Sequence, residues 1–177
     1  MKTKPFALAL VGGVLLAGLP AMAHADDDDD DRDRNINRTG SYTVKKGREI
    51  DGNITIRKGN LVINGDVDGN VTVRHGNIVI RGDVDGNVRQ LGRGSVTVTR
   101  SGSVDGNIIE RDHGNLTVSG DVDGTITELH RGHVRVYRAA EIDGSVRERG
   151  VGHLLIWRGA DVEGSLSEGG PGRLVRR

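Results

Sequence analysis

Residues 65–70 read GDVDGN, residues 82–87 repeat the same six letters, and residues 120–124 read GDVDG. The Asp-Gly step inside this phrase recurs along the chain, ending in one Glu-Gly variant, at positions 51, 68, 85, 105, 123, 143 and 163. The successive intervals are 17, 17, 20, 18, 20 and 20 residues. Self-similarity at a nearly constant period is typical of repeat proteins, whose units stack on one another. The phrase therefore predicts an internal structural repeat.

Each unit carries two short apolar segments that alternate with a period of two. In the second unit the alternate positions are Val71 and Val73, then Ile78 and Ile80. This alternation is the pattern of a β-strand with one buried face, and no unit shows a helical pattern. A flat meander would not explain the period. We therefore predict an all-β chain, a single-domain parallel β-helix (β-solenoid) over residues 40–168, with about seven coils of 17–20 residues.

Glycine is the most regular residue of the repeat. One glycine per unit is predicted to turn the chain sharply at a corner, because glycine adopts backbone angles closed to other residues. These structural turn residues are Gly52, Gly69, Gly86, Gly106, Gly124, Gly144 and Gly164. An asparagine, threonine or serine follows each of them, which predicts a hydrogen-bonded ladder along this corner. A second glycine in each unit, followed in four units by Asn60, Asn77, Ser95 and Asn115, indicates another such corner.

The acidic repeat does not match known calcium-binding loops. An EF-hand loop has the pattern D-x-[DN]-x-[DN]-G and a glutamate at position twelve. Position twelve is Asn77 when counted from Asp66, and Gly94 when counted from Asp83. The glycine-rich nonapeptide of calcium-binding β-helices is also absent. We therefore predict a structural role for the repeated acids, with no dedicated metal site and no cofactor.

Stacking of the coils nevertheless predicts acidic ladders. The candidate cation-ladder residues are Asp66, Asp68, Asp83, Asp85, Asp121 and Asp123. Like charges about 5 Å apart repel one another. Exposure to water, flanking residues such as Arg81 and Arg158, or bound cations such as calcium must offset that repulsion, and the sequence leaves these possibilities open.

The N-terminal segment has the features of a secretory signal peptide. In residues 1–25 two lysines precede an apolar run, and small residues flank an expected cleavage site after Ala25. This predicts a periplasmic or secreted protein, with an uncleaved N-terminal anchor as the alternative. The acidic leader, 26–39, is expected to be disordered because its consecutive aspartates repel one another. Residues 169–177 form a Gly/Arg-rich tail, in which Leu174 and Val175 can form a last short strand.

Composition argues against catalysis and nucleic-acid binding. The chain has 25 basic and 25 acidic residues and no cysteine, so it offers no thiol chemistry and no general basic surface. The spacing suggests no Ser-His-Asp arrangement, so we predict no enzyme and no catalytic residue. His133 and His153 occupy the same place in successive units and are expected to stack. Trp157 is expected to cap the core near the last coil, with an outer surface patch as the alternative.

The phrases V-D-G-N-V, G-D-V-D-G and I-D-G-S-V, within residues 47–168, resemble those of bactofilins, the polymer-forming cytoskeletal proteins of bacteria. The resemblance implies a right-handed parallel β-helix without helical caps, which assembles end to end into non-polar filaments without nucleotide. Bactofilins are cytoplasmic, whereas this chain carries an export signal. Its period also varies between 17 and 20 residues, which is expected to loosen the stack after residue 90.

Two functions remain open. The first is a non-enzymatic structural protein, a homopolymer or homo-oligomer that assembles through its open solenoid ends as an exported scaffold or surface polymer. The second is a monomeric envelope binding or adhesion module, whose stacked Asp/Asn and Arg/His ladders would contact cations or polysaccharide. Polymer length should depend on the terminal coils, whereas ligand binding should depend on the side faces.

Overall fold

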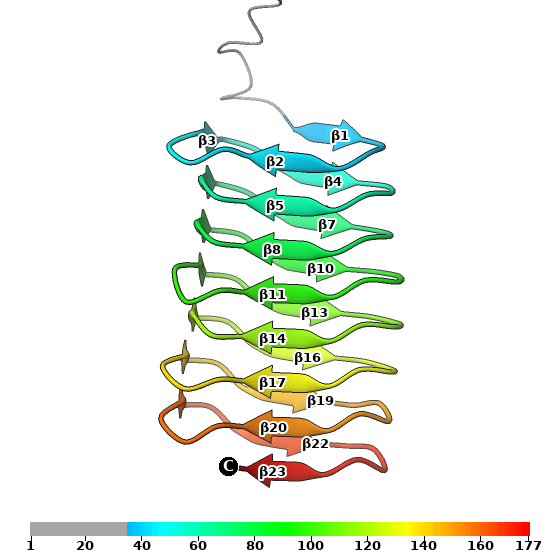
Figure 1. The fold of residues 1–177 in the computed structure, drawn as a ribbon, viewed down its shortest axis with the longest axis vertical. Coiled ribbons are helices and arrows are strands. Elements are labelled where there is room, and N and C mark those ends of the chain that lie inside the picture. The colour runs from blue at the N-terminus through cyan, green and yellow to red at the C-terminus, as the bar shows by residue number, and fades with distance from the viewer. Residues whose placement is uncertain (1–34) are drawn as a thin grey trace, which may run out of the picture.

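The computed structural model describes residues 35–177, which form a stack of flattened coils (Figure 1). These residues contain 23 strands and no helix, and each strand pairs in parallel with its equivalent in the next coil. The predicted β-solenoid is therefore confirmed. In Figure 1 the chain runs leftward in the front sheet and rightward behind it while descending, so the solenoid is right-handed. The predicted signal peptide and residues 26–34 of the leader lie outside the described residues.

Three parallel sheets form the sides of the solenoid and contain eight, eight and seven strands. The first sheet consists of β1 (Ile36–Arg38), β4 (Ile54–Ile56), β7 (Val71–Val73), β10 (Val88–Gln90), β13 (Ile108–Glu110), β16 (Ile126–Glu128), β19 (Val146–Glu148) and β22 (Leu166–Glu168). The second sheet consists of β2 (Tyr42–Val44), β5 (Leu61–Ile63), β8 (Ile78–Ile80), β11 (Val96–Val98), β14 (Leu116–Val118), β17 (Val134–Val136), β20 (Leu154–Ile156) and β23 (Leu174–Arg176). The third sheet consists of β3 (Glu49–Ile50), β6 (Asp66–Val67), β9 (Asp83–Val84), β12 (Ser103–Val104), β15 (Asp121–Val122), β18 (Glu141–Ile142) and β21 (Asp161–Val162).

The regular structure is longer than predicted at both ends. Strand β1 begins at Ile36, four residues before the expected start of the solenoid. Strand β23 ends at Arg176, inside the segment predicted as a tail.

The chain turns three corners per coil. We call them the first corner (first to second sheet), the second corner (second to third sheet) and the third corner (third sheet to the next coil).

The core is a narrow column of aliphatic side chains. Alternate residues of each strand point inward, as in β7, where Val71 and Val73 are fully buried and Thr72 is half-buried between them. No aromatic ring belongs to the buried core of residues 35–177. Each fully buried Val, Ile or Leu side chain contributes about 1.5–3 kcal/mol of transfer free energy. The period-two pattern alone therefore accounts for the three-sided core.

The variable period does not loosen the stack, so that expectation was wrong. From residue 91 onward each first corner has one more residue than the corners 57–60 and 74–77, and four second corners have two more than the others. Those longer second corners are residues 45–48, 99–102, 137–140 and 157–160. The strands on either side keep their register, as in the pairing of Val88 with Ile108 and of Val96 with Leu116. The extra residues are accommodated in the corners, and the sheets continue unchanged.

The glycines of the third corner are required for a reason other than the sharp turn that the sequence predicted. Positive φ angles occur at Gly59, Gly76 and Gly94 of the first corner, but at none of the seven predicted turn glycines. Coils instead approach closely at the third corner: a Cβ atom on Gly86 would lie 2.4 Å from the carbonyl oxygen of Gly69. Glycine is needed there because a side chain would collide with the backbone of the preceding coil.

Candidate functional site

The third sheet presents two exposed columns of acidic side chains. Each of its short strands places one apolar residue inward and one polar residue on either side of it facing outward, as in Asp66, Val67 and Asp68. The first column is Glu49, Asp66, Asp83, Asp121, Glu141 and Asp161, with the half-buried Ser103 between Asp83 and Asp121. The second is Asp51, Asp68, Asp85, Asp105, Asp123, Asp143 and Glu163. All six candidate cation-ladder residues lie in these columns and are exposed.

Charge repulsion acts along these columns. Partial burial, followed by the charges of Asp66 and Asp85, raises the pKa of Asp83 above its ordinary value. Partial burial and then Asp85, Asp123 and Asp83 raise the pKa of Asp105 in the same direction. An aspartate whose pKa is raised in the folded state lowers the free energy of unfolding once it ionises. Its negative charge then attracts dissolved cations.

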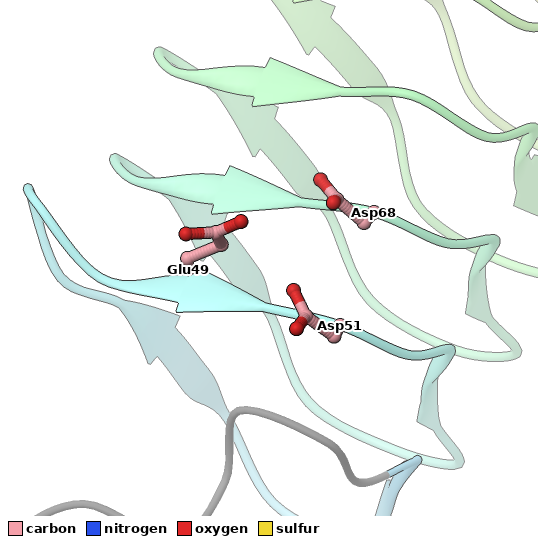
Figure 2. Close-up of side chains that lie close together, drawn as sticks. All are labelled: Glu49, Asp51 and Asp68. Atoms are coloured by element: carbon pink, nitrogen blue, oxygen red, sulfur yellow. The ribbon is translucent and has the colours of Figure 1, made fainter.

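At the N-terminal end of the acidic face, three acids converge. Carboxylate oxygens of Glu49, Asp51 and Asp68 lie within 4.8 Å of one another, on two successive coils (Figure 2). All three side chains are exposed. Calcium takes six to eight oxygen ligands. Three exposed carboxylates supply only part of that shell, so this group alone is suited to loose cation attraction.

We expect Asp105→Asn to stabilise the protein at low salt. The folded state raises the pKa of Asp105, so stability falls as pH rises above the ordinary aspartate value, and an amide removes that loss. Because the site is exposed, the gain at pH 7 should be only a few tenths of a kcal/mol, and salt should remove it. Thermal unfolding at low and high ionic strength measures both effects.

Glu163→Gln is the matched control for that experiment, because Glu163 ends the same column and therefore has an acidic neighbour in the column on one side only. It should change the midpoint less than Asp105→Asn does. A lower midpoint for Asp105→Asn at low salt would contradict the expectation and show that its charge makes a favourable contact.

The predicted ladder of the third corner is present. Asn53 Oδ1 accepts hydrogen bonds from the backbone N–H of Asn70 at 2.8 Å and from Asn70 Nδ2 at 3.0 Å. Asn70 Oδ1 in turn accepts from the N–H and Nδ2 of Asn87 at 3.1 and 3.0 Å. The ladder reaches Thr125, whose N–H donates to Asn107 Oδ1 at 2.9 Å, and a separate link follows where Ser145 Oγ accepts from Ser165 N at 3.2 Å. These side chains satisfy the corner amides left outside the strand ladders.

Histidines extend the ladder of the first corner. His133 Nδ1 accepts a hydrogen bond from His153 N at 2.9 Å, and His153 Nδ1 accepts from Arg173 N at 3.1 Å. The two rings stack with centroids 5.1 Å apart, which confirms the expected stacking. The histidines thus take the position that Asn115 holds one coil earlier, where Asn115 Oδ1 accepts from His133 N. Burial, followed by the charges of Arg135 and His153, lowers the pKa of His133.

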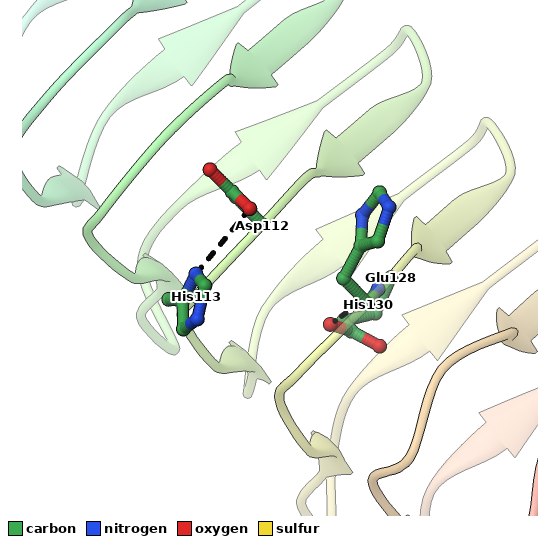
Figure 3. A network of polar contacts seen from close by, with 4 residues as sticks. All are labelled: Asp112, His113, Glu128 and His130. Carbon is green, nitrogen blue, oxygen red and sulfur yellow. Dashed lines mark hydrogen bonds and ion pairs between the residues drawn. The ribbon is translucent and has the colours of Figure 1, made fainter.

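An open hollow of about 490 Å³ lies over the first corners of the C-terminal coils. His113 and Asp112 form an ion-pair contact of 3.3 Å at its edge, and His130 belongs to the next coil (Figure 3). His75 and His113 are exposed corner residues. The hollow is lined by Leu129 and Pro171 together with histidine and arginine side chains, and no serine or threonine nucleophile lines it.

Trp157 packs, but against a neighbouring ring and not against the core. It stacks on Tyr137 with ring centroids 4.4 Å apart, and the guanidinium of Arg177 lies 5.7 Å from the Trp157 ring centroid. Ile156 takes the inward position, so the following residue enters the long second corner and lies partly exposed on the outside. The result is an aromatic stack on the solenoid surface.

The C-terminal coil exposes apolar side chains that equivalent coils bury. Leu174 is 44% exposed, whereas its partner one coil earlier, Leu154, is fully buried. Leu166 and Val162 are half-buried at the same end. Residues 35–177 contain no helix long and apolar enough to cross a membrane.

The chain matches the family model described as "Bactofilin: Polymer-forming cytoskeletal" over residues 73–167. No curated protein and no solved structure matches it. The matched segment covers more than half of the chain and runs from β7 to β22 of the solenoid. The stacked coils, the absence of helical caps in residues 35–177 and this match agree: the chain belongs to the bactofilin family of polymer-forming cytoskeletal structural proteins.

Proposed function

We propose that this bactofilin assembles end to end and that it does so outside the cytoplasm, as an exported scaffold or surface polymer. The exposed apolar edge of the last coil carries the assembly proposal. Export is supported by residues 1–25, whose charged, apolar and small-residue regions follow the order of a signal peptide.

The C-terminal end of the solenoid offers strand backbone groups and apolar side chains for contact with a coil of a second copy. The outer edge of the last described coil presents strand backbone groups that no other strand of residues 35–177 pairs with. Leu166, Leu174 and Val162 continue the three inward columns of the core up to this edge. A second copy stacked about 4.8 Å away would pair the backbone groups and cover the apolar side chains together.

Electron microscopy and light scattering on Leu174→Arg test the assembly. The unmodified protein should form filaments, and Leu174→Arg should shorten or abolish them because it places a charge in the end contact. Val151→Arg is the matched control, since Val151 is 58% exposed on the side of the solenoid and should leave filament length unchanged. A strictly monomeric wild-type protein, or equal filament lengths in both variants, would contradict end-to-end assembly.

Calcium and export require separate measurements. Filaments that form only with millimolar calcium would assign the acidic columns a part in assembly, whereas filaments indifferent to calcium would leave those columns structural.

Fractionation and N-terminal sequencing test export: the protein outside the cytoplasm should begin at Asp26. A cytoplasmic protein that begins at Met1 would contradict export and leave the assembly result intact.

The second candidate is a monomeric envelope module that binds cations or polysaccharide. The exposed acidic face and the Tyr137–Trp157 stack are the observations that favour it, since exposed rings and carboxylates suit sugar and cation contacts. Under this alternative the protein stays monomeric, and calorimetry should detect a binding heat that substitutions on these faces remove. Substitutions at the terminal coil should not affect it.

A further inference from the structure

A column of glutamate side chains runs inside the C-terminal half of the core. It occupies the last inward position of the first-sheet strands, where the early coils have Ile56 and Val73. Later coils place polar residues there, paired in register: Gln90, Glu110, Glu128, Glu148 and Glu168. The first four are fully buried, and the fifth, in the last coil, is half-buried. We call this set the glutamate column.

The column begins where the first corner becomes longer. From Gln90 onward each first corner has one extra residue, which adds backbone amides that the strand ladders do not pair. Glu128 Oε1 accepts from His130 N at 3.1 Å (Figure 3). Glu148 Oε1 accepts from Gly150 N at 2.8 Å and from Gly152 N at 3.1 Å. Glu168 Oε1 likewise accepts from Gly170 N at 2.9 Å. One carboxyl oxygen of Glu128, Glu148 and Glu168 thus holds the longer corner from the inside, whereas Glu110 makes no such bond.

The remaining oxygens of the column have no donor. Gln90 Oε1, both oxygens of Glu110, and Oε2 of Glu128 and of Glu148 are buried without a hydrogen-bond partner. No lysine, arginine or histidine is buried in the core of residues 35–177, and the second- and third-sheet side chains facing the column are aliphatic. Several unpaired carboxylates in such a core would cost several kcal/mol each.

Charged groups lie only on the outer side of the corners. The exposed ones at the longer first corners are Arg93, Arg111, Asp112, His113, His130, Arg131, Arg149 and Arg173, and His133 and His153 are half-buried there. Inside, Glu128 lies within hydrogen-bonding reach of both Glu110 and Glu148. Two carboxyl groups hydrogen-bond to each other only when one of them carries a proton. Geometry and burial therefore both require protons in the column.

We propose that Glu110 and Glu128 of the glutamate column bind protons as part of the native core, and that their ionisation at higher pH loosens the first corners of the C-terminal coils. A protonated carboxyl donates to its neighbour in the column, while Glu128 Oε1 holds the corner amide of His130. Ionisation removes the donors, places like charges about 4.8 Å apart and draws water towards the core. The column thus makes the stability of this half of the solenoid depend on pH.

The direction of the titration supports this assignment. Burial is the main cause that raises the pKa of Glu110 to about 7 and that of Glu128 to about 9, and contacts with the neighbouring glutamates add to the rise at Glu128. The folded state therefore binds more protons than the unfolded chain above the ordinary glutamate pKa. Stability then falls as pH rises from about 4.5 towards 9. The lowered pKa of His133 acts the opposite way, in a window below its ordinary value of 6.5.

Carboxyl-carbon NMR of the full chain across pH measures the protons directly. The acid dissociation constants of Glu110 and Glu128 should be at least about a hundredfold smaller than that of a free glutamate. Titration of Glu110 and Glu128 in the range of a free glutamate would overturn the proposal.

Chemical denaturation of Glu128→Gln between pH 5 and pH 9 tests the effect on stability. Glutamine is compatible with the column because Gln90 occupies it natively and is fully buried. We compare the equilibrium constants for unfolding of the unmodified protein and of Glu128→Gln. The ratio of the first to the second should increase at least about tenfold from pH 5 to pH 9. Glu141→Gln, an exposed acid on the third sheet, is the matched control and should show no such divergence.

Two outcomes would overturn the proposal at this stage. One is a difference between the unmodified protein and Glu128→Gln that stays constant with pH. The other is stabilisation at pH 8 by added calcium or sodium chloride in the unmodified protein but not in Glu128→Gln. That result would place a cation in the column where we infer protons.

Discussion

Gly124→Ala is expected to lower the free energy of unfolding by about 3 kcal/mol or more, or to prevent folding altogether. A Cβ atom at this position would lie 2.4 Å from the carbonyl oxygen of Gly106, 2.5 Å from its carbonyl carbon and 2.8 Å from the backbone nitrogen of Asn107. All three are backbone atoms of the preceding coil, so no side chain can rotate away. Relief requires the coils to separate, which weakens the parallel pairing on all three sides. Urea denaturation followed by circular dichroism measures the loss.

Gly169→Ala is the matched control for this experiment. The nearest atom to a Cβ atom there is the carbonyl oxygen of Glu148, at the ordinary contact distance of 3.7 Å. That substitution should change stability by less than about 1 kcal/mol. If Gly124→Ala unfolded at the same urea concentration as Gly169→Ala, the close coil-to-coil contact at the third corner would be wrong.

Ile108→Ala is expected to cost about 2–5 kcal/mol, the usual range for removing a large aliphatic side chain from a packed core. Ile108 is fully buried in β13, in register between Val88 and Ile126. The core is narrow and its coils are held in register, so neighbouring side chains cannot collapse far into the cavity. The lost transfer energy and the cavity therefore both contribute. Urea unfolding at fixed pH measures this difference.

The adjacent isoleucine provides a control of identical chemistry. Ile109 follows Ile108 in the same strand but points outward and is only half-buried. Ile109→Ala should therefore cost less than about 1 kcal/mol. Equal losses for the two substitutions would contradict the inward and outward assignment of β13, and with it the register of the first sheet.

Much of the fold follows from local sequence. The period-two alternation of Val71 and Val73 identifies the buried face, because successive side chains of a strand point to opposite sides. The nearly constant spacing of the Asp-Gly steps predicts stacked coils. It also indicates the register of the strands, since a one-residue shift of a strand would turn its apolar residues outward. The acidic columns follow directly from the same repeat, as do the stacked rings of His133 and His153.

Other features depend on neighbours in space that the sequence does not reveal. Alternation from Ile108 places Glu110 inside, but a glutamate is ordinarily expected at the surface. Its neighbours in the column, Glu128 and Glu148, accept hydrogen bonds from amides of the longer first corners, and those contacts form only once the coils are stacked. The reason for the third-corner glycines was likewise hidden, because the contact is made with a residue in the preceding coil.

The sequence by itself determined the all-β class, the repeat, the inward residues and the polar ladders of this bactofilin. Each of these depends on a periodicity that every unit repeats. Only the tertiary structure decided where the extra residues are accommodated, why Gly124 cannot carry a side chain and how glutamates come to lie in the core. These depend on distances between atoms in different coils, and such distances exist only once the coils are stacked.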